Sequence, residues 1–239
     1  MFDFFRRGQP SSRQIGKLVK RLTESGGEDG PRIEAAERLA ESGTPDALYA
    51  LLKRFTISRK VMTQDIEEKR LVVSMLVDKG RDAVDPILRF LGTHHQVEWP
   101  VQALSKILPR EEFVPKLVEI LGEVAASSAF TPPEHKADLI RAMRGHITPE
   151  ISTALRAFLS DDDDDVRIAA IEALAEAGEE QREVLLGAFI DVDDRPRIRI
   201  KVAEMFADHE WPVKGYRPKV EELLPEGFHI TAKGIIRRR

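Results

Sequence analysis

The chain has 239 residues, a net charge of −4 and 42% apolar residues, a composition typical of a folded protein that excludes predominant disorder. It contains no cysteine, so disulfide bonds, thiolate metal ligands and cysteine nucleophiles are excluded. No window reaches the roughly 18 consecutive apolar residues of a membrane span, and the start MFDFFRR lacks the pattern of a signal peptide. We therefore expect a cytoplasmic protein.

The charge is distributed unevenly along the chain. Residues 1–60 carry 12 basic and 8 acidic side chains, residues 151–210 carry 7 and 16, and residues 211–239 carry 7 and 3. A protein that binds nucleic acid usually presents a continuous basic surface. The acidic segment argues against nucleic acid as the partner.

The N-terminal region, residues 1–30, is expected to cap the open end of a helical stack. It begins with a short aromatic and basic head that consists of Phe2, Phe4, Phe5, Arg6 and Arg7. Apolar residues then recur three and four positions apart at Ile15, Leu18, Val19 and Leu22. This spacing predicts an amphipathic helix.

Internal similarity is the most informative feature of the sequence. RIEAAERLAESG (32–43) recurs as RIAAIEALAEAG (167–178), with eight of twelve positions identical. IRIKVAEMFAD (198–208) lies 32 residues after VRIAAIEALAE (166–176), and KRLVVSMLVDKG (69–80) is a weaker copy. A second apolar segment with helical spacing follows each copy, and six such segments occur, at 45–55, 84–91, 114–121, 151–159, 183–190 and 219–224.

Six helix pairs at this spacing predict an all-α, right-handed α-solenoid over residues 31–224, because each pair exposes an apolar face that the next pair must cover. The pattern resembles HEAT-like repeats of the short bacterial type that also occurs in phycobilisome lyases. In that family the first helix begins near an Asp and a Val-Arg, carries Ala where backbones approach, and ends at Gly. The matching residues are Asp165, Val166, Arg167, Ala170, Leu174 and Gly178, and, in the first copy, Arg32, Ala35, Leu39 and Gly43.

Five consecutive aspartates, Asp161 to Asp165, precede one of these helices. An Asp at this place accepts hydrogen bonds from the free amides of the first helical turn. The alternative is that the carboxylates bind a hard cation, but the run lacks the spaced D-x-D-x-D-G arrangement of a calcium loop. We expect one cap residue and a solvated turn, and similar N-caps at Thr44 and Thr148, each of which precedes a proline.

The sequence contains no catalytic constellation. HEAT-like iron-dependent hydroxylases use several His-Glu pairs, whereas here His209-Glu210 alone has that order. No phosphate-binding glycine loop and no G-x-S-x-G motif occurs. We therefore assign no catalytic residue, no metal ligand and no cofactor.

Both tryptophans lie in the tetrapeptide EWPV, at 98–101 and 210–213. We expect Pro100 and Pro212 to begin helices, with Trp99 and Trp211 packed over the first turn. The alternative is an aromatic platform like that of HEAT-like alkylpurine DNA glycosylases. The Trp-x-x-x-Asp pattern of that family is missing, since Ala103 follows Trp99 at the fourth position.

Two sets of residues are candidates for binding a partner. Alignment of the second helices places Lys53, Arg89, Glu119 and Arg156 in one column of the surface that usually binds partners in a solenoid. Residues 225–239 leave the helical period and predict a small β-hairpin or an extended basic tail. Its cations are Lys233, Arg237, Arg238 and Arg239.

These features favour a non-enzymatic scaffold or adaptor that binds another protein, for example through an acidic or phosphorylated segment. The alternative is a nucleic-acid-directed protein of the glycosylase type. The sequence specifies neither the partner nor the oligomeric state.

Overall fold

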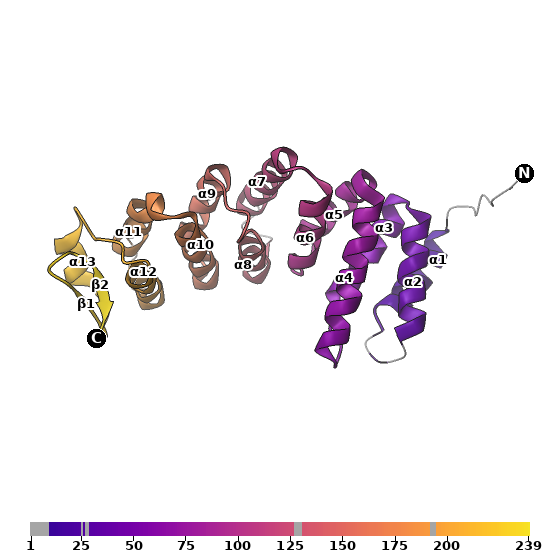
Figure 1. Ribbon diagram of the computed structural model, residues 1–239, viewed down its shortest axis with the longest axis horizontal. Coiled ribbons are helices and arrows are strands. Elements are labelled where there is room, and N and C mark those ends of the chain that lie inside the picture. The colour runs from indigo at the N-terminus through magenta and orange to yellow at the C-terminus, as the bar shows by residue number, and fades with distance from the viewer. Residues whose placement is uncertain (1–9, 25, 27–28, 127–130, 192–194) are drawn as a thin grey trace, which may run out of the picture. The chain divides into compact units, whose positions relative to one another are not determined.

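The computed structural model describes residues 10–24, 26, 29–126, 131–191 and 195–239. Within these residues the regular structure is helical except for one short β-hairpin (Figure 1). The chain divides into two units, Met1–Phe113 and Val114–Arg239, a division that the sequence did not predict. The predicted all-α class is confirmed, and the aromatic head lies outside the described residues.

The first unit consists of helices in two layers. The first helix of each pair belongs to one layer, which contains α2 (Asp29–Ser42), α4 (Met62–Lys79) and α6 (Glu98–Ile107). The other layer contains α1 (Ser12–Leu22), α3 (Pro45–Leu52) and α5 (Val84–Leu91), with α3 in contact with both of its neighbours. The short 3₁₀ helices η1 (Lys53–Thr56) and η2 (Gly80–Ala83) adjoin these helices, and α7 (Arg110–Ala126) crosses the boundary between the units.

The second unit repeats the arrangement of helix pairs. Its first helices are α8 (Pro133–Ala142), α10 (Asp164–Ala177) and α12 (Pro196–Asp208), and α10 packs against both of the others. The second helices and the remaining elements are α9 (Pro149–Leu155), η3 (Arg156–Ser160), η4 (Glu179–Gln181), α11 (Arg182–Ile190), α13 (Arg217–Leu223), β1 (Phe228–Ile230) and β2 (Ile236–Arg238). The predicted helix-pair solenoid is therefore confirmed within each unit, and Thr44 and Thr148 are N-caps as predicted.

The cores of the two units are built from the same residue types at matching positions. Ala35 and Leu39 of α2 are buried, and so are Ala170 and Leu174 of α10. Alanine lets the backbones of neighbouring helices approach, and leucine fills the space between them. The sequence copies therefore correspond to a repeated packing arrangement.

The arginine that the sequence copies share binds the turn before its own helix. In three copies its guanidinium donates a hydrogen bond to a backbone carbonyl oxygen six to ten residues earlier. The donor and acceptor residues are Arg32 and Glu24 at 2.7 Å, Arg167 and Asp161, and Arg199 and Phe189 at 3.4 Å. We call this contact the arginine clamp; it supplies a donor to a carbonyl group that no helix satisfies.

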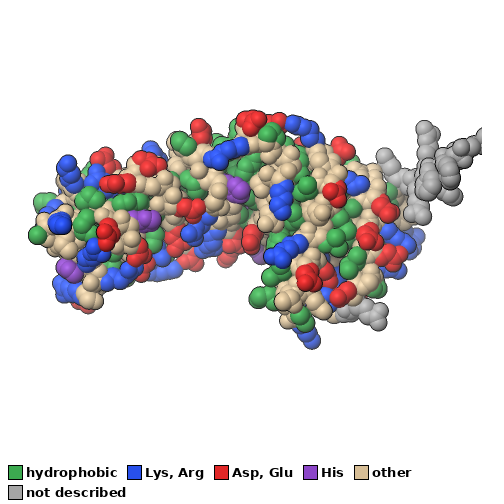
Figure 2. Space-filling view, viewed as in Figure 1, with side chains coloured by type: hydrophobic (Ala, Val, Ile, Leu, Met, Phe, Trp, Pro, Cys, Tyr) green, Lys and Arg blue, Asp and Glu red, His purple; other side chains and the backbone are tan. Residues whose placement is uncertain are grey.

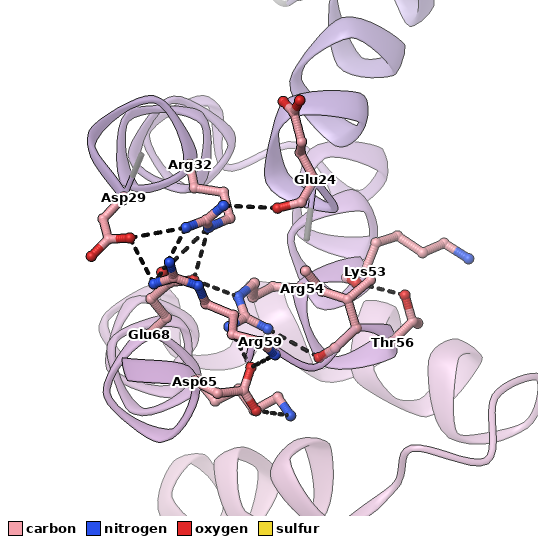
Figure 3. A network of polar contacts seen from close by, with 11 residues as sticks. Glu24, Asp29, Arg32, Lys53, Arg54, Thr56, Arg59, Asp65 and Glu68 are labelled. Carbon is pink, nitrogen blue, oxygen red and sulfur yellow. Dashed lines mark hydrogen bonds and ion pairs between the residues drawn. The ribbon is translucent and has the colours of Figure 1, made fainter. Parts of the chain in front are cut away.

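In the first unit this contact is part of a buried ion network (Figure 3). The Glu68 carboxylate of α4 accepts hydrogen bonds from Arg32 at 3.1 Å, Arg54 at 2.8 Å and Arg59 at 2.8 Å. Arg54 also donates to Asp65 at 2.7 Å, and its side chain is 1% exposed. Because three guanidinium groups converge on one carboxylate, Glu68 joins α2, η1 and α4.

Asp65 has a lowered pKa in this network. Burial alone would raise the pKa, but hydrogen bonds and charge from Lys69 and Arg54 outweigh it. A carboxyl group with a lowered folded pKa stabilises the fold at all pH values above its ordinary pKa of about 3.9, and this contribution is lost as the pH falls through the folded value. The network is therefore sensitive to acid.

Replacement of Glu68 by glutamine should lower the free energy of unfolding of the first unit by about 3–5 kcal/mol, because the buried Arg32 and Arg54 and the partly buried Arg59 lose their shared counter-charge. The measurement is urea unfolding in a Trp211→Phe background, in which the fluorescence of Trp99 reports on the first unit alone. Glu67→Gln is the matched control, because this neighbour on α4 is exposed. Equal unfolding midpoints of the two variants would contradict the role of Glu68.

The aspartate run contains the predicted cap. Asp163 is the N-cap of α10, and its side chain accepts hydrogen bonds from the amides of Asp165 at 2.8 Å and Val166 at 3.3 Å. Among the described residues, which include the whole run, no group of three or more His, Asp or Glu side chains has the geometry of a metal site.

The run also has ionic contacts that the sequence did not predict. These are Asp161 with Lys136 at 2.7 Å, Asp164 with Arg195 at 2.6 Å, and Asp165 with Arg197 at 2.6 Å. The Lys136 side chain is 5% exposed, so Asp161 supplies the counter-charge of a buried ammonium group. We expected a solvated turn around the cap. This expectation was wrong for Asp161, because its carboxylate pairs with the buried Lys136 of α8.

Replacement of Asp163 by alanine should destabilise the protein by about 0.5–2 kcal/mol, because two amides of the first turn of α10 lose their acceptor. Asp162→Ala is the matched control, since that side chain is exposed and caps nothing in the structure. Thermal melting measures both variants, and added Ca²⁺ or Mg²⁺ should shift neither. A further variant replaces all five aspartates, Asp161 to Asp165, by asparagine. If Ca²⁺ or Mg²⁺ raised the melting temperature of wild type but not of this variant, a metal site would be supported instead.

The two EWPV tetrapeptides adopt different structures. Trp99 and Pro100 lie in the first turn of α6, as predicted, and the Trp99 ring stacks on Phe55 with centroids 6.4 Å apart. The same prediction was wrong for Pro212, which forms an isolated antiparallel bridge with Ile235 before α13 begins.

The difference arises at the end of α12. Glu210 has a φ of 55°, and the amide of Trp211 donates to the Phe206 carbonyl oxygen at 3.1 Å. The Trp211 ring packs edge-on against Phe206, with centroids 5.7 Å apart. These are the features of a Schellman motif, which ends a helix and redirects the chain. Trp211 therefore packs on the helix before it and not on the one after it.

The last residues form a hairpin that covers α12. Strands β1 and β2 pair in antiparallel register, with Phe228 opposite Arg238. Phe228 and Ile236 are buried. Arg237 pairs with Glu210 at 2.6 Å, and Arg238 pairs with Asp208 of α12 at 2.5 Å. The segment is therefore part of the second unit and not a free basic tail.

Candidate partner-binding site

Helix α3 and the adjoining η1 each present one polar residue away from the buried face of α3. Thr44 caps the helix by accepting a hydrogen bond from the Ala47 amide at 3.3 Å, and Pro45 follows in the first turn. Leucines of α3 are buried in the core. Tyr49 and Lys53 are four residues apart, which places them one above the other on the opposite side.

The neighbouring helix α5 adds a third residue. Ile87, Phe90 and Leu91 are buried, whereas Arg89 is 56% exposed. The chain turns directly after α5, where the amide of His94 donates to the Phe90 carbonyl oxygen at 2.9 Å. This turn places the His94 ring on that of Phe90, with centroids 4.2 Å apart.

Two cations lie against the ring of Tyr49. The guanidinium carbon of Arg89 is 3.7 Å from the ring centroid, and the ammonium nitrogen of Lys53 is 5.0 Å from it. Cations at these distances are attracted by the electron-rich face of the ring. The ion pair of Arg89 with Asp46 is 3.6 Å long and joins two exposed groups, so it contributes little.

The hydrogen bonds around His94 define its neutral tautomer. Lys53 Nζ lies 2.6 Å from His94 Nε2, and since an ammonium group can only donate, Nε2 accepts. His94 Nδ1 then carries the proton and donates to Thr93 Oγ1 at 2.8 Å, while the Thr93 hydroxyl donates to the Arg89 carbonyl oxygen at 2.9 Å. The contact with His94 thus helps to fix the orientation of the Lys53 side chain.

The cations also act on the Tyr49 hydroxyl. Burial alone would raise the pKa of Tyr49, but the hydrogen bond with Thr93 and the positive charges of Lys53 and Arg89 outweigh it and lower the pKa. The positive potential at this place therefore stabilises the deprotonated phenol. The same potential would stabilise any other anion that approaches.

Of the predicted column, the structure brings Lys53 and Arg89 together. Glu119 and Arg156 belong to the second unit, where Glu119 pairs with Lys116 at 2.8 Å and Arg156 donates to Gln181 at 3.1 Å. Among the cations of the C-terminal segment, Arg238 pairs with Asp208 of α12 and Arg237 pairs with Glu210 in the turn after α12, whereas Lys233 and Arg239 have exposed side chains. The clearest cationic site among the described residues is the one at Tyr49.

Tyr49 and His94 were missed in the sequence. The signal for Tyr49 was its spacing of four residues from Lys53, which places both on one side of a helix. His94 has no such local signal, because its contact with Lys53 spans 41 residues of chain.

Stacked helix pairs, each in contact with its neighbours, define the class of helical-repeat proteins. A family model described as HEAT repeats matches residues 125–207, which supports a HEAT-like repeat protein. The first unit shows the same helix pairs, including the arginine clamp at Arg32. No curated protein and no solved structure matches the chain. The likeness to the phycobilisome-lyase type stays a prediction.

None of the helices in the described residues combines enough length with enough apolar character to span a lipid bilayer.

Removal of Arg89 should raise the pKa of Tyr49, because the cation on its ring stabilises the phenolate form. The chain has two tyrosines, so a Tyr216→Phe background leaves Tyr49 as the reporter. Spectrophotometric titration of the phenol compares this background with its Arg89→Gln variant. An unchanged titration midpoint would show that Arg89 does not lie on the ring in solution.

Proposed function

We propose that the protein is a non-enzymatic interaction protein that binds an anionic segment of another protein at Tyr49, Lys53 and Arg89. HEAT repeats generally mediate protein binding, and the second helices of a solenoid commonly form the binding surface. The observation that carries the proposal is the placement of two cations on one tyrosine ring, where the ion pair with Asp46 at 3.6 Å is weak.

The site is prepared to bind anionic oxygen atoms. The Arg89 guanidinium carbon lies 3.7 Å from the Tyr49 ring centroid, and a guanidinium group has N–H donors that can bind a carboxylate or a phosphate. His94 uses one N–H group of Lys53, and the ammonium group has three. Because both side chains are ordered before a partner arrives, binding costs less conformational entropy.

The contacts of the tryptophans support this function over the glycosylase alternative. Trp99 stacks on Phe55, and Trp211 is 7% exposed and packs on Phe206. Rings engaged in this way are poor platforms for an extruded base. The absence of enzymatic activity and the cytoplasmic location stay predictions.

Replacement of both cations, in the variant Lys53→Gln/Arg89→Gln, should weaken binding of an acidic peptide about tenfold, since two charge-assisted contacts are lost. The measurement is the fluorescence anisotropy of labelled tetraglutamate, with a phosphoserine peptide of equal charge as the second probe. Both probes should respond, because the site recognises anionic oxygen.

The matched control is Arg70→Gln/Lys79→Gln, which removes the same charge from α4 in the other layer of the first unit. This variant should bind like wild type. Equal weakening by the two variants would mean that net charge and not the Tyr49 site governs binding, and would contradict the proposal.

A further inference from the structure

The helix α1 carries a continuous cationic face. It contains four basic residues and no acidic residue, and all four basic side chains are exposed. They are Arg13, Lys17, Lys20 and Arg21. At 3.6 residues per turn they fall within an arc of about 100°. The apolar residues on the opposite side are Ile15, Leu18, Val19 and Leu22.

This face belongs to the same layer as the Tyr49 site. Helix α1 contacts α3, and α3 contacts α5. Without the buried side chains, α1, α3, η1 and α5 contain six basic and two acidic residues, whereas α2, α4 and α6 contain four basic and seven acidic residues. Figure 2 shows acidic side chains interspersed with basic ones over α2 and α4. Positive charge is therefore concentrated in the layer of second helices.

We propose that α1 and the Tyr49 site form one cationic strip that binds an extended acidic polypeptide segment. The inference rests on the proposed function and names the class of its partner. Neighbouring helix axes lie about 8–10 Å apart, so α5 and α1 are separated by roughly 20 Å. An extended chain advances about 3.3 Å per residue, so a segment of about six residues or more reaches from Arg89 to α1.

The width of the strip favours a single acidic chain over duplex nucleic acid. The strip is one helix layer wide and borders a layer with an excess of acidic residues. A duplex carries phosphates on two strands, and those of the second strand would approach the acidic layer. A single polypeptide places its carboxylates on the cations alone.

The experiment compares labelled tetraglutamate with labelled dodecaglutamate by fluorescence anisotropy. The short peptide covers the Tyr49 site only, and the long peptide also reaches α1. Lys17→Gln/Lys20→Gln should weaken binding of the long peptide about tenfold and leave the short peptide unchanged. Lys53→Gln/Arg89→Gln should weaken both, and Arg70→Gln/Lys79→Gln neither.

Three other outcomes would contradict the strip, the proposed function or the class of the partner. If Lys17→Gln/Lys20→Gln binds the long peptide like wild type while Lys53→Gln/Arg89→Gln binds it more weakly, the proposal of a continuous strip is wrong, but the proposed function of the Tyr49 site is supported. If the Lys53/Arg89 variant also binds both peptides like wild type, the proposed function fails as well. Tighter binding of a duplex DNA of matched charge would overturn the assignment of an acidic polypeptide. Circular dichroism verifies that each variant is folded.

Discussion

The turns between helix pairs impose the constraint on which the repeats depend. A helix end leaves carbonyl groups without intrahelical donors, and a turn packed between two pairs has limited access to water. The arginine clamp resolves this conflict at Arg32, Arg167 and Arg199 by supplying a charged donor from the next helix. A guanidinium group suits this role because it stays protonated and presents several N–H groups in one plane.

The same geometry produces the candidate site. Once successive pairs are fixed, α3 and α5 lie side by side, and residues distant in sequence meet at Tyr49. The cations of the site belong to helices whose other faces fill the core, and the turn after α5 contributes His94, which contacts Lys53. A rigid support of this kind keeps Lys53 and Arg89 in place without a bound partner.

The helix pairs could be predicted from the sequence because their signals are local. Apolar spacing fixed the second helices, and Thr44 marked a helix start through contacts within one turn. Pro212 could not be predicted, since EWPV is identical at both sites and the sites differ in the turn that ends α12 and in the bridge with Ile235. The convergence on Glu68 was also hidden, although opposite charges one repeat apart were a usable signal. Examples are Arg32 with Glu68, Arg81 with Glu112, and Arg144 with Glu176.

The arginine clamp has a direction, because the donor always follows its acceptor along the chain. A ribosome adds about 5–20 residues per second, so a turn carbonyl waits roughly a second for its arginine to be synthesised. Each pair is thus completed by the beginning of the next. After α12 the chain continues into the hairpin, which supplies contacts of a similar kind: Val213 donates to Gly234 at 2.8 Å, and Arg217 donates to Thr231 at 3.1 Å. Assembly of the second unit therefore requires the hairpin strands β1 and β2 in addition to its helix pairs.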